Sequence, residues 1–438
     1  MKNTFISKIR LLSLVLGSAV LMTQCEKKVV EELPEIVLSD KGVRVSALAS
    51  APSVLNMDSV TSDSGHAYSL KKNFQTSGDS NNEPYISVLK IYENGIELGP
   101  AHAVHNDIRN LGEGRFSHWG NRLYFSASDN TDPRTNGRVY TYSVGEAGPI
   151  GYANVDGLTT GGEGGDTVVV YTLPDLIDAA SSSSPLCIFV ADSILGSGYI
   201  NVNSNKTIVG LSGSSLEGFG LFIYDKNNII IKNMTIRNVE TYTNIIIKEN
   251  SHHVWVDHCT LSSILIPNDW ETYDGLLDVT GGASYVTVSW SKFSNSHIPI
   301  LIGGGDYSYG DIGKLKVTLY NNYFHNVSER QPRVRFGTVH VFNNYFKDVS
   351  GYSVGSSVGA TVRTDNNYFE DVNMPITTVL GTSQAGYISG ESTNSYLNSG
   401  SNNITTTAST WLPPYSYQSL VIPAANVPAI VLAGAGAN

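Results

Sequence analysis

The pattern of apolar and polar residues along the chain predicts two β-rich regions. From residue 36 to residue 146, short apolar runs alternate with turn-forming residues, and an Asn94-Gly95 pair separates two of these runs as in a β-hairpin. No helical period occurs in this region, so we expect a small β-sandwich-like module. Further on, residues 171–184 carry apolar side chains at helical spacing behind Pro174 and predict the one clear helix of the chain.

After this helix, short strand patterns recur, and six of them can be aligned so that one column is apolar and a second column, two residues later, is polar. The apolar column is Ile236, Leu261, Phe293, Phe324, Phe346 and Phe369, and the polar column is Asn238, Ser263, Asn295, Asn326, Asp348 and Asp371. A helix-free strand repeat of about 22–25 residues predicts a solenoid of stacked coils, which is a parallel β-helix. We expect the asparagines to occupy turns with left-handed backbone and to hydrogen-bond along the stack.

Two of the repeats are longer than the others because they carry insertions, IPNDWETYDG and HIPILIGGGDYSYGDIG. Insertions in solenoids gather on one face, often the binding face. Polar residues cluster in sequence near these insertions: Asp274, Asp278 and, one repeat earlier, Asn244, followed later by Arg330, Arg333 and Arg335. Carboxylate and amide oxygens suit Ca²⁺, although two carboxylates four residues apart are more commonly part of a solvated loop.

Composition and charge limit the partners of the protein. The 438-residue chain has a formal net charge of −11, which argues against nucleic acid as the main partner. A polyanionic substrate remains compatible with this charge if a basic patch or a bound cation meets it. After Cys25, only Cys187 and Cys259 remain, both in apolar runs, so we expect buried thiols and no disulfide framework.

The two ends of the chain carry apolar segments. A basic front and the apolar run LLSLVLGSAVLM precede MTQC, which resembles a bacterial lipoprotein signal of residues 1–25 with Cys25 as the lipidated residue. Residues 26–35 are charged and aperiodic and are interpreted as a tether. Prolines interrupt the C-terminal stretch LVIPAANVPAIVLAGAG, for which we predict packed coil without a membrane span.

Five stretches together resemble one known family. GYANVDGLTTGGEGG, VWVDHCTLSS, DGLLDVTGGASYVTVSWSKF, LIGG and RQPRVRFGTVHVFNNYF are similar to the pectate lyases, family 1 of the polysaccharide lyases. The resemblance covers about residues 147–438, in order and without large gaps. It implies an all-β fold, with a right-handed parallel β-helix following the small module, and cleavage of polygalacturonate by Ca²⁺-assisted β-elimination to unsaturated oligogalacturonides.

The resemblance also implies roles for individual residues. Asp274 and Asp278 match two calcium-binding carboxylates, Arg330 matches the catalytic base, and Arg335 matches the arginine that grips the substrate carboxylate. Arginine is an unusual base because it normally stays protonated. Arg333 is a further candidate for substrate binding, with pairing to an acidic loop residue as the alternative.

Two positions depart from the family pattern. Asn244 stands where the family has a third calcium-binding carboxylate, and Ile298 stands where it has a substrate-binding lysine. His297, next to Ile298, is a candidate substrate contact. His258, His340 and Asp257 lie inside strand patterns and are expected to be structural.

Three alternatives to a pectate lyase remain open on the sequence alone. Asn244 and Ile298 favour a pectin lyase that acts on methylated chains without metal, whereas Asp274 and Asp278 argue against it. A hydrolase would need an acid and a base carboxylate across the site, and a non-catalytic pectin-binding β-helix would not need the arginine group.

We expect a monomer that is exported, as an outer-membrane or cell-surface lipoprotein or as a periplasmic or secreted protein. The lipid anchor is its only expected contact with membrane.

Overall fold

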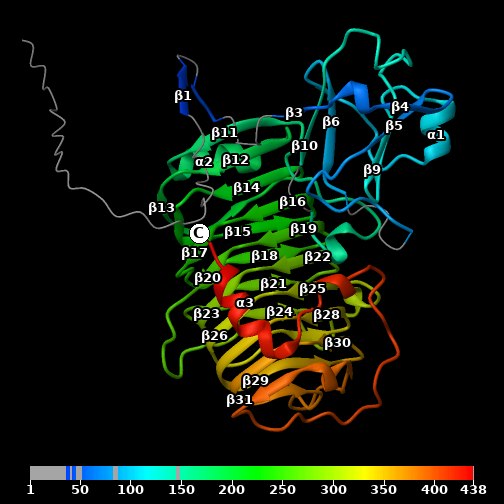
Figure 1. The fold of residues 1–438 in the computed structure, drawn as a ribbon. Coiled ribbons are helices and arrows are strands. Elements are labelled where there is room, and N and C mark those ends of the chain that lie inside the picture. The colour runs from blue at the N-terminus through cyan, green and yellow to red at the C-terminus, as the bar shows by residue number, and fades with distance from the viewer. Residues whose placement is uncertain (1–35, 40–41, 46–51, 82–86, 145–147, 438) are drawn as a thin grey trace, which may run out of the picture.

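The computed structural model describes residues 36–39, 42–45, 52–81, 87–144 and 148–437. The predicted signal peptide and tether, and the predicted lipidation site Cys25, lie outside these residues. The main body is a parallel β-helix of two long sheets, whose coils follow one another from β11 down to β33 (Figure 1). This confirms the predicted solenoid.

The strands of the two sheets alternate along the chain, because each coil contributes to both. The ten-stranded sheet contains β11 (Asp166–Val170), β12 (Leu186–Val190), β14 (Lys206–Gly210), β16 (Asn227–Lys232), β19 (His252–Asp257), β22 (Ser284–Ser289), β25 (Lys316–Tyr320), β28 (Thr338–Phe342), β30 (Thr361–Asp365) and β32 (Tyr387–Ser389). The thirteen-stranded sheet contains β13 (Ser193–Asn201), β15 (Ser215–Tyr224), β17 (Thr235–Arg237), β18 (Ile245–Lys248), β20 (Thr260–Ser262), β21 (Leu277–Val279), β23 (Lys292–Ser296), β24 (Ile300–Ile302), β26 (Tyr323–Val327), β27 (Arg333–Arg335), β29 (Tyr345–Ser357), β31 (Tyr368–Thr377) and β33 (Ser395–Leu397).

The apolar column predicted from the repeat is a stack of side chains in the core. Each residue of the column pairs in register with the next, from Ile236 to Phe369. The four phenylalanine rings are stacked at centroid distances of 4.9, 4.9 and 4.7 Å, with interplanar angles of 11°, 10° and 7°. All four are fully buried. Stacking of identical coils therefore supplies a continuous apolar core that no single coil could bury.

Asparagines stabilise the turns in two ladders. In the predicted column, Asn295 and Asn326 have φ values of 55° and 52°, and the Asn326 amide donates to Asn295 Oδ1 at 2.8 Å. A second ladder lies inside the coil, where the Nδ2 atoms of successive residues donate to the next Oδ1 at 3.0, 3.0 and 3.1 Å. Its members are Asn322, Asn344, Asn367 and Asn394. The alignment missed this inner ladder because its asparagines precede the apolar column.

The N-terminal module has two four-stranded antiparallel sheets, as predicted for a β-sandwich-like unit. One sheet contains β3 (Ser53–Val54), β10 (Tyr140–Val144), β6 (Leu89–Glu93) and β7 (Ile96–Glu97); the other contains β4 (Thr61–Ser64), β5 (Ala67–Lys71), β9 (Arg122–Phe125) and β8 (Phe116–Trp119). The predicted hairpin joins β6 to β7. A separate hairpin of β1 (Ile36–Ser39) and β2 (Gly42–Val45) precedes them. The expectation of no helix here is wrong, because α1 (His105–Asn110) buries Ile108 against the sheets.

The predicted helix after the module is α2 (Leu173–Ser181). Thr172 caps its N-terminus by accepting a hydrogen bond from the Asp175 amide, and Pro174 occupies the first turn. The C-terminal coil prediction is wrong, since α3 (Val427–Gly434) is helical and buries Val427 and Val431. Its proline lies in the first turn, where a helix needs no amide donor. Among the described residues, no helix is long and apolar enough to cross a membrane.

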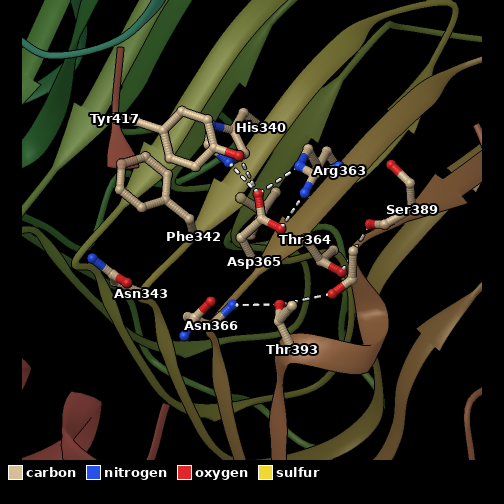
Figure 2. Close-up of polar contacts among 12 residues, drawn as sticks. His340, Phe342, Asn343, Arg363, Thr364, Asp365, Asn366, Ser389, Thr393 and Tyr417 are labelled. Atoms are coloured by element: carbon tan, nitrogen blue, oxygen red, sulfur yellow. Dashed lines mark hydrogen bonds and ion pairs between the residues drawn. The ribbon is translucent and has the colours of Figure 1, made fainter. Parts of the chain in front are cut away.

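The C-terminal segment is attached to the ten-stranded sheet through a polar network around Asp365 (Figure 2). Tyr417 Oη donates to Asp365 Oδ2 at 3.0 Å, and Arg363 reaches both carboxylate oxygens at 2.6 and 2.9 Å. His340 Nε2 lies 3.1 Å from Asp365 Oδ2, while its Nδ1 lies 3.0 Å from Tyr415 Oη. Burial opposes ionisation of Asp365, but the His340 and Arg363 hydrogen bonds prevail and hold the pKa of Asp365 below its usual value. His340 is thus structural, as predicted.

Candidate functional site

The predicted site residues lie on or just before four parallel strands of the thirteen-stranded sheet, β18, β21, β24 and β27, which continue a run that begins with β15. These strands, β15, β18, β21, β24 and β27, pair in that order, and we call them the central strip. Along each strand, side chains alternate between the core and the outer face. One outward column runs through the register as Phe222, Ile246, Asp278, Leu301 and Arg333. The column places the predicted carboxylate and arginine positions on one face. The first insertion precedes β21, and the second insertion contains β24.

Asp274 and Asp278 form a pair of carboxylates on this face. Thr243 Oγ1 donates to Asp278 Oδ2 at 2.8 Å. Burial raises the pKa of Asp278 to about 7; the Thr243 hydrogen bond opposes this shift, the charge of Asp274 adds to it and the charge of Arg330 opposes it. The two carboxylates and Arg330 therefore interact directly through their charges.

Two carboxylates held near each other repel each other unless a proton or a cation compensates their charge. The uncompensated negative charge and the oxygen donors fit a divalent cation such as Ca²⁺. The set is small, because no group of three or more His, Cys, Asp or Glu residues that could hold a metal occurs in the described part of the chain. A bound cation would need further oxygens from water or substrate.

Asn244 contributes little to this donor set. Its side chain is only 1% exposed, and its Nδ2 donates to the carbonyl oxygens of Ile236 and Ser262 at 2.7 and 3.3 Å. The amide nitrogen is thereby bound into the wall of the coil. Only Oδ1 remains to meet a cation.

Arg330 lies in the turn between β26 and β27. Its φ is 68°, and its carbonyl oxygen accepts a hydrogen bond from Ile300 N at 2.9 Å. The strand ladder resumes just beyond Pro332, as β27. The side chain stays 25% exposed, and its Nε donates to Glu329 Oε1 at 3.2 Å.

Arg335 and Arg333 share a carboxylate from the second insertion. Arg335 Nε donates to Asp306 Oδ1 at 2.6 Å and its Nη1 donates to the Gly303 carbonyl at 3.1 Å. Arg333 Nη2 lies 3.9 Å from the same Asp306 oxygen and donates to Ser383 Oγ at 2.9 Å. Desolvation, followed by the charge of Arg335, lowers the pKa of Arg333. Both guanidiniums are oriented from behind by protein groups.

His297 is held by the first insertion. Its Nε2 lies 2.8 Å from the Ile266 carbonyl oxygen, its Nδ1 lies 2.9 Å from Ser328 Oγ, and Trp270 stacks on the ring at a centroid distance of 4.4 Å. Both ring nitrogens are therefore engaged within the protein, and the residue is 9% exposed.

Sequence reasoning missed the groups that orient the site. Thr243, Asp306, Glu329 and Ser383 each bind one of the predicted residues. Asp306 lies in the second insertion, which was itself predicted to border the site, so an acidic residue there was a usable signal. Thr243 and Ser383 are distant in sequence from the residues that they bind. Glu329 is next to Arg330 but belongs to no distinctive sequence pattern.

Comparison with protein families and curated proteins gives a consistent result. A family model described as Pectate lyase matches residues 139–438. A pectate trisaccharide-lyase of Bacillus licheniformis is 38% identical over 281 residues, covering 61% of this chain and 80% of that protein. A probable pectate lyase B of Aspergillus terreus is 43% identical over 219 residues, covering 50% of this chain and 67% of that protein.

Solved structures show the same similarity. A pectate lyase from Bacillus sp. N165, in complex with trigalacturonate, superposes with a TM-score of 0.58 at 32% identity, covering 66% of this chain and 98% of that chain. A pectate lyase from Xanthomonas campestris gives a TM-score of 0.55 at 28% identity, with the same shares of both chains. The matched part in both cases is about two thirds of this chain.

Proposed function

This chain is a polysaccharide lyase of the pectate lyase family, and on that premise we propose that it cleaves polygalacturonate by Ca²⁺-assisted β-elimination with Arg330 as the base. The observation that carries the proposal is the interaction of Asp278, on the outer face of the central strip, with the charges of Asp274 and Arg330. The hydrolase and non-catalytic interpretations of the sequence are set aside by the family.

In the proposed reaction, the uronate carboxylate lies between the arginines and the two aspartates. Arg335 and Arg333 bind and orient this carboxylate, with Asp306 holding the Arg335 guanidinium in place. Asp274 and Asp278 would hold the cation. When bound, Ca²⁺ acts as a Lewis acid on the substrate carboxylate and compensates the two aspartate charges beside Arg330.

Arg330, in its neutral form, then accepts the proton from C5 of the uronate at one of its terminal nitrogens, since its Nε is bonded to Glu329. The electron pair of the C5–H bond forms the C4–C5 double bond, and the C4–O bond breaks. The leaving oxygen takes a proton from water, and the remaining hydroxide takes the proton from Arg330, which restores the neutral base. The products are a new chain end and an unsaturated uronate.

A second candidate is lyase activity on methylated pectin, which does not depend on metal. Two observations favour it: the Asn244 amide nitrogen is bound to backbone carbonyls, and Ile298, in place of a lysine, is only 9% exposed. Methyl esterification makes the C5 proton more acidic without a cation.

The test compares polygalacturonate with highly methylated pectin, each with Ca²⁺ and with EDTA. The proposal predicts that the ultraviolet absorbance of the unsaturated product grows on polygalacturonate with Ca²⁺ and stops in EDTA. Activity on methylated pectin that EDTA leaves unchanged would favour the second candidate. New reducing ends without that absorbance would contradict both.

We also propose that the protein is exported and anchored by a lipid on Cys25, as the basic and apolar N-terminal sequence supports. The wild-type protein should fractionate with membranes, and Cys25→Ala should release it or leave it unprocessed. A wild-type protein that is wholly soluble and begins downstream of Cys25 would contradict the anchor.

A further inference from the structure

The strands of the central strip continue from β21 through β18 to β15, toward the N-terminal end of the β-helix (Figure 1). The column of Asp278 passes through Ile246 to Phe222, two strands away. At a strand spacing of about 4.8 Å, Phe222 lies about 10 Å along the sheet from Asp278. A neighbouring column pairs Lys248 with Tyr224. A chain that lies over the aspartates and follows the columns therefore reaches these side chains next.

A pocket opens at this end of the strip. It has a volume of about 440 Å³ and is lined by Ser181, Asn201, Val202, Asn203, Phe222, Tyr224 and Lys226. Asn201 pairs in register with Phe222, so the pocket continues the column of Asp278 by one further strand. No acidic residue is among the lining residues.

Aromatic side chains gather around the pocket and stay exposed. The Phe222 ring lies 4.7 Å from that of Tyr199 and 5.6 Å from that of Tyr224, and Tyr199 lies 5.2 Å from Tyr242. The three tyrosines are 42%, 48% and 40% exposed. Tyr242 precedes Asn244 by two residues, which places the group beside the candidate site. Rings that are fixed by one another and open on one face are a preformed surface for stacking.

The charge of the pocket is positive within an acidic protein. Lys226 lines the pocket, and Lys248 lies on the strand between the pocket and Asp278. Neither lysine forms an ion pair with another residue in the part of the chain that the structure describes. Two lysines without acidic partners, next to exposed aromatic rings, suit a ligand whose rings have an apolar face and carry carboxylates.

We propose that this pocket is a distal binding subsite for a uronate residue of the same polysaccharide chain whose scissile bond lies over Asp278 and Arg330. This inference rests on the proposed function. Phe222 and Tyr224 stack on the apolar face of the sugar ring, Lys226 pairs with its carboxylate, and Lys248 binds the carboxylate of a residue on the way. Ile298 stands where the family has a substrate-binding lysine, so the site lacks that contact near the reacting residue. The distal subsite compensates by adding affinity for long chains.

The test measures kcat/KM for trigalacturonate and for long polygalacturonate in the wild type, in Phe222→Ala/Lys226→Gln and in a control, Tyr387→Ala, which removes an exposed tyrosine of the other sheet. The ratio of kcat/KM for the long substrate to that for the short one should fall about tenfold in the double variant, mainly through KM. The control should keep the wild-type ratio. Melting temperatures of all three proteins establish that they are folded.

Three results would overturn the subsite, and they can be told apart. A wild-type protein that cleaves both substrates, with the same length ratio in the double variant, would leave the proposed function standing and refute the subsite. A wild-type protein that cleaves neither substrate would refute the function and the subsite together. A fall of equal size on both substrates would place Phe222 and Lys226 at the reacting residue and would also contradict a distal position.

Discussion

At the scale of single residues, the site consists of reactive groups and of the groups that orient them, and these two classes differ in how far the sequence reveals them. Asp278 and Arg330 lie in stretches whose order and spacing resemble a known family, so the sequence was enough to predict them. Thr243 and Asp306 act through hydrogen bonds that only the stacking of coils creates. Their roles could therefore be recognised only in the folded structure.

Asp306 is expected to be a positioning residue for Arg335. In Asp306→Ala, the guanidinium loses the acceptor at 2.6 Å that fixes its orientation, so KM for polygalacturonate should rise about tenfold with a smaller change in kcat. Steady-state kinetics check this, with Asp178→Ala on the exposed side of α2 as the control. A KM that stays constant or falls would show that Asp306 competes with the substrate.

Asn244 is expected to limit the affinity for calcium. Asn244→Asp restores a third carboxylate beside Asp274 and Asp278, so the Ca²⁺ concentration for half-maximal rate should fall, by about tenfold for one added charge. Titration of the initial rate with Ca²⁺ measures it, and Asn238→Asp, on a turn of the same β-helix, is the control. An unchanged requirement would mean that position 244 does not face the cation.

At the scale of elements, the repeat in the sequence predicted the register of the strands, because the phenylalanines of successive coils can stack in the core only in that register. The alignment placed Phe293, Phe324, Phe346 and Phe369 opposite one another, and they are so paired. The inner asparagine ladder was not predicted, because a buried amide differs from an exposed one only by its surroundings. α3 was missed because Pro423 and Pro428 suggested a break, although Pro428 lies in the first turn of the helix.

His340 should make the stability of the fold depend on pH. Desolvation lowers its pKa, so the fold favours the neutral ring, which donates to Asp365 and accepts from Tyr415. This stability is fully present above the unfolded pKa of about 6.5 and is lost as the pH falls below it, by at most about 1.4 kcal/mol per pH unit.

The comparison of wild type with His340→Gln isolates this effect, because glutamine can donate and accept in the same places without titrating. Thermal melts at pH 7.5 and at pH 5.5 should show a smaller decrease in melting temperature for the variant than for the wild type. Equal decreases would show that other groups dominate the acid sensitivity.

At the scale of the whole molecule, the chain combines a β-helix that carries the site with a smaller N-terminal module whose sheets contribute no residue to it (Figure 1). The change of pattern near residue 147 marked this division in the sequence. The β-helix supplies a long, regular face, and regular spacing along parallel strands suits a polymer of repeating units. The second insertion provides Asp306, and the turn before β27 provides Arg330, at the centre of that face.

The central claim is that Arg330 removes the proton, and the most direct test is the kcat of Arg330→Lys on polygalacturonate with saturating Ca²⁺. Lysine keeps the positive charge but not the reach of the guanidinium, so kcat should fall at least about 10³-fold, or about 4 kcal/mol of transition-state stabilisation. Arg122→Lys, in the N-terminal module, should keep wild-type kcat. An Arg330→Lys protein with an unchanged melting temperature and more than about a tenth of wild-type kcat would contradict the account.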